Sequence, residues 1–507
     1  AGSGGAEYTL VPFLANTRGE ARLDVEAVGA NLIDPLGPPN PARLPRDAAA
    51  PARDHVLHPQ LMDRMRATVA PRLRPSGALR SIEAEPTTAA AVPTVGSSIT
   101  IRIPQFYLNQ DPCEQSVTRQ ARVGAVTEHA ILVTDVANPA GGLTDAELLA
   151  FGQEFDQQIY PLDTQYFGTP TDLDANGRVI IAFTREVNAL TPPGSGGGYV
   201  GGFFFAGDLF PLQPTARQDA CPRSNVGEIF YLLAPDPAGA VNGNRRSREL
   251  VVQSAGGTIA HEFEHLINAS RRIFVNDAAE FEDSWLDEGL AHSAEEINFY
   301  AASGLSPRRN LTLAQISTPA VAGAVDRYML ENFGRYLTYM EAPDSNSVIG
   351  PDLLETRGGS WAFLRYAADR KATGDQPFFY SLVNSKLTGL PNLSQVIGAN
   401  GLDWVQDWTM AVYTDDAVPG VDPRFVQPSW NFRDIMPRVS DVYGGPERFP
   451  LRVHVLGSAN QEEVRLRGGG AAYLRFGIGP SARVGLRLTS KEQLPPSSLR
   501  FTLVRTR

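Results

Sequence analysis

Two histidines and a glutamate in residues 258–267, Thr-Ile-Ala-His-Glu-Phe-Glu-His-Leu-Ile, have types and a spacing that suit metal chemistry. Residues four apart lie on one face of an α-helix, so His261 and His265 can bind the same ion. Zinc suits this arrangement, because it binds imidazole nitrogens and carboxylate oxygens in a tetrahedron. Glu262 can reach a water molecule held by that ion. The two histidines leave two coordination positions, one for a further protein ligand and one for the water.

Glu288 is the candidate for the third ligand. It belongs to the sequence Trp-Leu-Asp-Glu-Gly-Leu-Ala-His, which opens a helical segment expected over residues 284–299. A third histidine is not expected, because Asn268 and Arg271 stand where the metzincin pattern has its glycine and histidine. A carboxylate from the later helix remains, and Asp287 is the alternative to Glu288.

The two motifs together resemble the gluzincin metallopeptidases, and their surroundings resemble the hyicolysin-like family of secreted bacterial enzymes. H-E-x-x-H followed by W-L-x-E-G-x-A carries this resemblance, which extends over residues 177–369. It implies that His261, His265 and Glu288 bind zinc and that Glu262 is the catalytic base. The expected fold is therefore of the α+β class and zincin-like, with a mixed sheet lobe and a helical lobe that meet at a cleft beside the zinc helices.

A peptidase of this kind needs a second donor, besides the metal, for the oxyanion that forms during attack. No histidine lies between His292 and His454, and Glu355-Thr-Arg-Gly is the nearest equivalent of the Y-x-K-G motif of aminopeptidase-like gluzincins. His292 follows Glu288 by one helical turn, so we expect it either to orient a ligand or to fill polar space between helices. The open candidates for the donor are Arg357, Tyr328, Tyr336, Tyr339 and Tyr366.

The composition limits the class of protein. The 507 residues are 42% hydrophobic and 20% charged, with a formal net charge of −11. A chain of this length is expected to form two or three globular domains. The negative charge argues against nucleic acid as a partner, and no apolar run reaches the ~20 residues of a membrane-spanning helix. The preference for Arg over Lys, with abundant Ala, Gly and Pro, indicates a bacterial genome of high GC content.

Cys113 and Cys221 are too far apart in the sequence for a local redox or zinc motif. In an exported protein we expect them to form a disulfide, whereas in a cytoplasmic protein they would be two buried thiols. The peptidase resemblance favours a secreted protein and therefore the disulfide.

The sequence Asp172-Leu-Asp174-Ala-Asn176-Gly177 has the spacing of the first half of a calcium-binding loop. Phe183 stands at the twelfth position, where an EF-hand has glutamate, so a complete EF-hand is not expected. The two interpretations are a site for Ca²⁺ and an Asx-rich turn in front of a strand.

The texture of the sequence divides the chain into four parts. Residues 1–34 alternate as two accessory strands. Residues 35–96 are rich in Pro, Ala and Arg, which is typical of a linker or a retained pro-segment, with a short helix expected at 58–69. Residues 97–440 are expected to form the metallopeptidase domain. Residues 441–507 alternate as five short strands of a small β-sandwich, an all-β domain that the N-terminal strands could complete.

Within the metallopeptidase domain, the glycine-rich residues 194–202 precede three phenylalanines. They are expected either to lead into an edge strand that pairs with an extended peptide, or to form a surface loop before an aromatic cluster. The other expected elements are strands at 98–103, 130–135, 179–184 and 228–233, helices at 144–160, 359–371 and 393–414, and an irregular stretch at 419–450.

Three functions fit these patterns: a secreted zinc endopeptidase, a zinc aminopeptidase, and a non-catalytic binding or adhesion protein with structural zinc. The G-x-M-E-N sequence of aminopeptidases is missing upstream of the zinc motif. A structural site usually has four protein ligands and no use for a base such as Glu262. The sequence therefore predicts a zinc endopeptidase acting on proteins or peptides.

Overall fold

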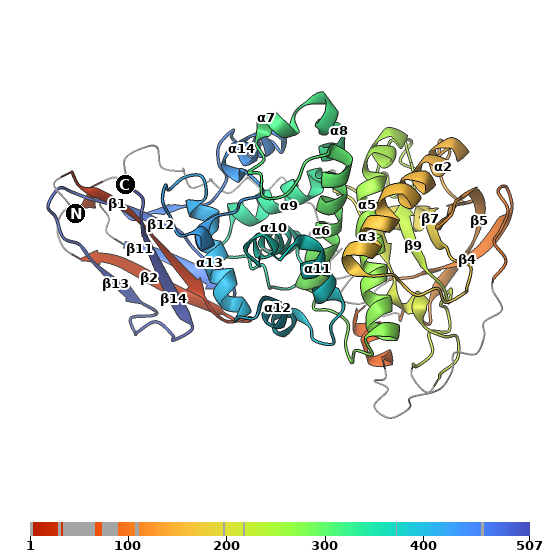
Figure 1. Ribbon diagram of the computed structural model, residues 1–507, viewed down its shortest axis with the longest axis horizontal. Helices are drawn as coiled ribbons and strands as arrows, with labels where there is room; N and C mark the ends of the chain where they lie inside the picture. The colour runs from red at the N-terminus through yellow and green to blue at the C-terminus, as the bar shows by residue number, and fades with distance from the viewer. Residues whose placement is uncertain are drawn as a thin grey trace.

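The computed structural model places strands at both ends of the molecule and helices between them (Figure 1). The predicted α+β class is confirmed. The residues that the structure describes are 4–28, 32–33, 66–73, 90–106, 111–195, 198–215, 218–371, 373–457 and 461–507.

One end of the molecule is a mixed sheet built, in the described residues, from β4 (Ser98–Pro104), β5 (Ser116–Val126), β6 (Ala130–Asp135), β7 (Val179–Thr184), β8 (Gly202–Phe204) and β9 (Ile229–Leu233). The order is β4-β5-β6-β7-β9-β8, so β8 lies at an edge. The central strands β6, β7 and β9 are parallel, and the other pairings are antiparallel. Parallel strands are covered on both faces, which explains the continuous apolar sequence of β7.

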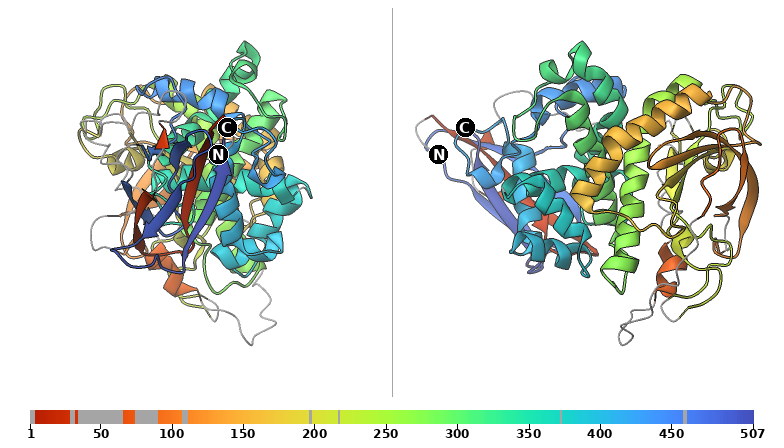
Figure 2. Two further views of the ribbon diagram at one scale, coloured as in Figure 1. Left: turned by 90° about the vertical axis from the view of Figure 1, so that its left-hand side faces the viewer. Right: turned by 45° about the vertical axis from the view of Figure 1, so that its right-hand side comes forward.

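A long helical segment packs beside this sheet (Figure 2). It comprises α2 (Asp145–Glu154), a π-helical turn (Phe155–Ile159) and α3 (Tyr160–Phe167), and the short α4 (Arg185–Leu190) follows β7. The side chain of Thr144 accepts a hydrogen bond from the amide of Glu147, whose carboxylate accepts one in return. This capping box is the one that the sequence predicts.

The longest helices are α5 (Arg248–Ser270) and α6 (Ser284–Ser303), and α5 lies between the sheet and α6 (Figures 1 and 2). The stretch 393–414 is broken by Gly398, whose φ is 71°. The stretch 419–450, expected to be irregular, contains a helix at 432–442. The other helices are α7 (Leu313–Ile316), α8 (Pro319–Tyr328), α9 (Leu330–Glu341), α10 (Leu354–Lys371), α11 (Asp375–Val383), α12 (Gly389–Ile397), α13 (Gly401–Thr414) and α14 (Phe432–Val442).

Two glycines allow α5 and α6 to approach their neighbours closely. A Cβ atom on Gly202 of β8 would lie 2.9 Å from Cγ2 of Thr258 on α5 and 2.8 Å from the carbonyl oxygen of Tyr231. A Cβ atom on Gly289 of α6 would lie 2.8 Å from Cδ1 of Leu364 on α10. Any larger residue would push β8 away from α5, or α6 away from α10.

The other end of the molecule joins the first and last strands of the chain, β1 (Ala6–Leu14), β2 (Glu20–Val28), β3 (Leu32–Ile33), β10 (His454–Val455), β11 (Gln461–Arg467), β12 (Leu474–Ile478), β13 (Gly485–Thr489) and β14 (Leu499–Arg505). One sheet has the order β10-β12-β1-β14, with β3 also on β12, and the second has the order β11-β2-β13. Both long N-terminal strands therefore lie between strands from the C-terminal part.

The two sheets share a hydrophobic core that contains Leu10, Leu23, Val25, Val464 and Leu474. Along β2, buried residues alternate with more exposed ones, as expected for a strand with one face on a core. The chain termini lie at this end of the molecule (Figure 1).

The disulfide predicted between Cys113 and Cys221 is confirmed. It joins the loop before β5 to the loop before β9.

Of the helix expected at 58–69, only residues 66–69 are described; they are helical and continue into the 3₁₀ turn Ala70–Arg72. In the described residues, the helices are all too short or too polar to cross a membrane.

We expect Leu23→Ala to lower the free energy of unfolding by about 2–5 kcal/mol, because Leu23 is fully buried between the two terminal sheets. The control is Arg22→Ala, since the Arg22 side chain is 42% exposed and its ion pair should contribute under about 1 kcal/mol. Urea unfolding of the whole chain measures both. Equal effects of the two substitutions would contradict the observed orientation of β2.

Candidate metal centre

The structure brings His261, His265 and Glu288 together where α5 and α6 pack side by side. Nε2 of His261 lies 3.2 Å from Nε2 of His265 and 3.4 Å from Oε2 of Glu288. Nε2 of His265 lies 3.8 Å from the same oxygen. Two ligands of a tetrahedral zinc ion, each about 2.1 Å from the metal, are about 3.4 Å apart. The three donor atoms therefore have the spacing of a zinc ligand set.

Burial of these donors also fits a cation. Glu288 is fully buried, and its Oε2 has no hydrogen-bond donor among the described residues. His261 and His265 are 7% and 4% exposed. A buried carboxylate oxygen without a partner is costly, because it has lost its hydration. A zinc ion among the three residues would satisfy this oxygen, so the residues present fit the metal.

Glu295 of α6 orients the first histidine. Its Oε1 lies 2.7 Å from Nδ1 of His261, so the imidazole can donate its Nδ1–H and direct the lone pair of Nε2 to a metal. Nδ1 of His292 lies 2.9 Å from the same Oε1, and the rings of His261 and His292 are 4.5 Å apart. His292 is therefore a buried neighbour of the candidate ligand His261.

The second histidine and the glutamate have their own partners. Oδ2 of Asp287 lies 3.4 Å from Nδ1 of His265, on the opposite side of the ring from the proposed ligand atom Nε2. Nη2 of Arg357 lies 2.8 Å from Oε1 of Glu288, and its guanidinium also binds both oxygens of Asp352. Arg357 thus holds Glu288 in place, and Asp287 stands behind His265.

Burial and charge set the protonation of the centre. Burial lowers the pKa of His261 to about 4, which leaves its imidazole neutral. Burial acts in the same direction on His265, but Asp287 and Glu288 outweigh it and raise its pKa to about 10. The surrounding carboxylates therefore favour a positive charge at His265, and a metal ion would supply that charge in place of the proton.

Glu262 points from α5 toward the sheet. It is 5% exposed, and burial raises its pKa to about 7, against a smaller opposing effect of the nearby Phe204 backbone. Phe204 belongs to the edge strand β8, so the carboxylate lies between the histidines and the edge of the sheet.

The four candidate tyrosines make other contacts. The hydroxyl of Tyr328 donates a hydrogen bond to Glu154, and that of Tyr366 donates one to the carbonyl of Arg424. Tyr336 and Tyr339 are fully buried, and both rings lie near Trp408.

The candidate calcium loop closes on itself. Carboxylate oxygens of Asp172 accept hydrogen bonds from the amides of Asn176 and Gly177, and Asp174 accepts one from the amide of Asn176. Oxygens of Asp172, Asp174 and the buried Glu228 lie within 4.8 Å of one another. The amide contacts belong to the Asx-rich turn, and Ca²⁺ binding stays a prediction.

Among the residues that contact the candidate ligands and their neighbours, sequence patterns weakly indicate Glu295 but do not indicate Arg66 or Asp352. Glu295 follows Glu288 by two helical turns, so both face α5, although a polar helix face has the same spacing. Arg66 and Asp352 lie far from the motifs in the sequence, and the first falls in the expected linker. Arg66 binds Asp287 at 2.6 Å, a contact that only the fold reveals.

We expect Glu288→Gln to abolish tight zinc binding, and Glu295→Gln to raise the zinc dissociation constant by roughly 10–100-fold, because Glu295 acts through His261. Competition with a chromophoric chelator measures both constants. Asp24→Asn, on the distant strand β2, is the control. Unchanged zinc affinity in Glu288→Gln would exclude Glu288 as a ligand.

Comparison with known proteins points to one class of enzyme. No protein-family model matches the chain. The chain is 30% identical, over 155 residues, to the neutral metalloprotease ShpI of Staphylococcus hyicus. The match covers 31% of this chain and 32% of that relative, so the chain spans about a third of its length. Together with the motifs, this match shows that the chain resembles zinc metallopeptidases of the hyicolysin-like kind.

Proposed function

We propose that the protein is a secreted zinc endopeptidase of the gluzincin type, in which His261, His265 and Glu288 hold the metal. The observation that carries the proposal is the convergence of these three donors beside the buried carboxylate of Glu262. A third ligand that is a glutamate from the following helix is the feature that would make the enzyme a gluzincin. The match to a metalloprotease supports the reaction class.

The chemistry follows from the residue types. A zinc ion bound here would polarise the scissile carbonyl and make a water molecule more acidic. Glu262 then takes a proton from the attacking water and returns it to the departing amine. A pKa near neutrality suits both steps, and burial shifts Glu262 in that direction.

The edge strand β8 offers a place for the substrate backbone. Within the described residues, β8 pairs with β9 on one side, and no strand pairs with its other side. An extended peptide can add to such an edge through main-chain hydrogen bonds. The contact between Phe204 and Glu262 would then bring the peptide bond close to the base.

The disulfide supports secretion of the protein. The disulfide Cys113–Cys221 is typical of proteins from oxidising compartments. We therefore propose that the enzyme acts outside the cell.

We expect Glu262→Gln to lower casein hydrolysis by at least about 10³-fold while one zinc ion per chain remains bound, because the amide cannot accept the proton. Elemental analysis and a casein assay on the same samples measure the two properties. A casein-degrading Glu262→Gln variant would contradict the role of this residue. Bound zinc without hydrolysis in the unmodified chain would favour a non-catalytic zinc protein.

We expect peptides with acetylated amino termini to be cleaved at internal bonds, because the open edge of β8 has no requirement for a free amine. Mass spectrometry of the products identifies the bonds. Cleavage restricted to peptides with free amino termini, one residue at a time, would identify an aminopeptidase instead.

A further inference from the structure

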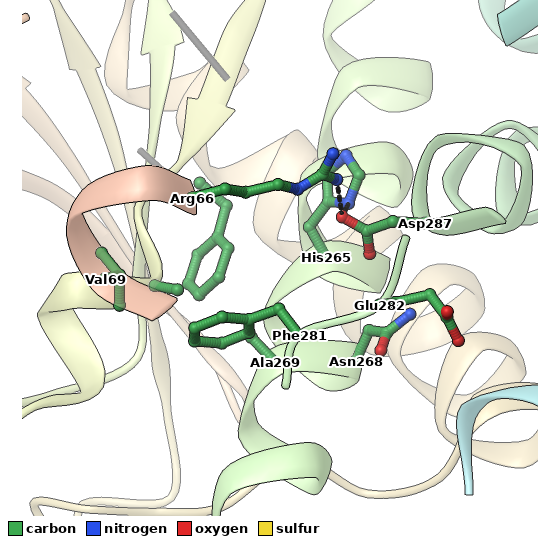
Figure 3. A pocket seen from close by; sticks show the side chains of 10 residues that line it. Arg66, Val69, His265, Asn268, Ala269, Phe281, Glu282 and Asp287 are labelled. Carbon is green, nitrogen blue, oxygen red and sulfur yellow. Dashed lines mark hydrogen bonds and ion pairs between the residues drawn. The ribbon is translucent and has the colours of Figure 1, made fainter. Parts of the chain in front are cut away.

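A pocket beside the zinc ligand His265 lies between the sheet part and α6 (Figure 3). Phe204 of the edge strand and Phe281 give it apolar walls, and Asp287 supplies a carboxylate. The segment 66–73 lines its remaining side, through residues that the sequence places in a linker. The pocket therefore adjoins the strand edge, the metal centre and a segment from outside the expected catalytic domain.

Arg66 extends from this segment across the pocket to Asp287 (Figure 3). Its Nη2 lies 2.6 Å from Oδ2 of Asp287, which immediately precedes the ligand Glu288. Nη1 is buried and has no hydrogen-bond acceptor among the described residues. Burial would lower the pKa of Arg66, but the charges of Asp287, Asp352 and Glu288 outweigh it and raise that pKa. The contact with Asp287 shows that this pocket accepts a guanidinium group.

The rest of the segment is fixed to the sheet part near the disulfide. Nη2 of Arg72 lies 2.7 Å from Asp111, and its Nε donates a hydrogen bond to the carbonyl of Ala220. The amide of Asp219 donates to the carbonyl of Arg72, and Val69 is only 1% exposed. The segment is therefore held at one end on the sheet part, while Arg66 crosses to α6.

We propose that this pocket recognises a basic side chain of the peptide substrate, and that Arg66 occupies it as an internal competitor. The proposal rests on the proposed peptidase function. Apolar walls pack along the methylene groups of an arginine or lysine, and a carboxylate at the end pairs with its charge. A substrate with a basic residue at this subsite has to displace Arg66 before it binds.

A purely structural role for Arg66 makes the opposite prediction. If Arg66 served only to hold Asp287 against His265, its loss would weaken zinc binding and lower hydrolysis. Loss of a competitor leaves zinc bound and strengthens substrate binding. The sign of the effect therefore separates the two roles.

Arg66→Ala and Arg66→Gln in the full chain test whether Arg66 competes with the substrate for the pocket. The substrates are acetylated, internally quenched alanine peptides that carry one arginine, norleucine or glutamate at each position in turn. We expect kcat/KM for arginine peptides to rise at least tenfold, mainly through a lower KM, with zinc content unchanged. The control Arg22→Ala, in an exposed ion pair on β2, should have no effect. Reduced hydrolysis with weaker zinc binding in both Arg66 variants would overturn the proposal.

A binding measurement gives a result that does not depend on hydrolysis. The probe is the acetylated peptide Arg-Ala-Thr-Val-Ala-Pro-Arg-Leu, which copies residues 66–73. Calorimetry should show at least tenfold tighter binding to Arg66→Ala/Glu262→Gln than to Glu262→Gln alone. Replacing the first arginine of the probe by norleucine should remove this gain.

The two proposals can fail separately. If the probe bound equally tightly to zinc-loaded Arg66→Ala/Glu262→Gln and to zinc-loaded Glu262→Gln, the proposal that Arg66 competes with substrate would be overturned. This holds whatever the hydrolytic activity of the protein. The expected difference in affinity, together with no hydrolysis by any variant, would reject the peptidase function and leave the basic-residue pocket standing.

Discussion

Contact between the imidazoles of α5 and the carboxylates of α6 is the interaction on which the rest of the structure depends. Glu295 fixes the ring of His261 through Nδ1, and this turns Nε2 toward Oε2 of Glu288 at 3.4 Å, the spacing of two ligands of one ion. This requires the two helices to run side by side at close range, and Gly289 allows α10 to support α6 from behind. The sheet supports α5 from the other side, through β8 and β9.

The centre gathers negative charge that a protein interior does not tolerate without compensation. Glu262, Asp287, Glu288 and Glu295 are all wholly or largely removed from water around two histidines. Arg357 compensates part of this charge through Glu288 and Asp352. Buried charges of one sign are retained when opposite charges or a metal neutralise them. The surplus of carboxylates therefore explains why this place suits a divalent cation, and why a neighbouring pocket attracts a guanidinium.

Local patterns predicted the parts of the fold that local physics decides. The capping box at Thr144, the apolar strand β7 and the spacing of His261 and His265 depend on near neighbours in the chain. The approach of Arg66 to Asp287 depends on a contact across 221 positions, for which no periodic pattern exists. The helix α14 was missed because Pro437 within it and the surrounding Pro and Gly residues indicate irregular structure, whereas packing of its buried face decides the outcome.

The position of β1 also determines when the molecule can be completed during synthesis. Tyr8 pairs with Phe476 on one side and with Arg505 on the other. The strand β1 therefore cannot pair until β12 and β14 have been synthesised. Until these emerge from the ribosome, the apolar faces of β1 and β2 have no core to join, and such exposed strands are prone to aggregate. The helices α5 and α6 can pack earlier, because they are close in sequence. The sheets that β1 and β2 share with the C-terminal strands are thus expected to form after α5 and α6 have packed.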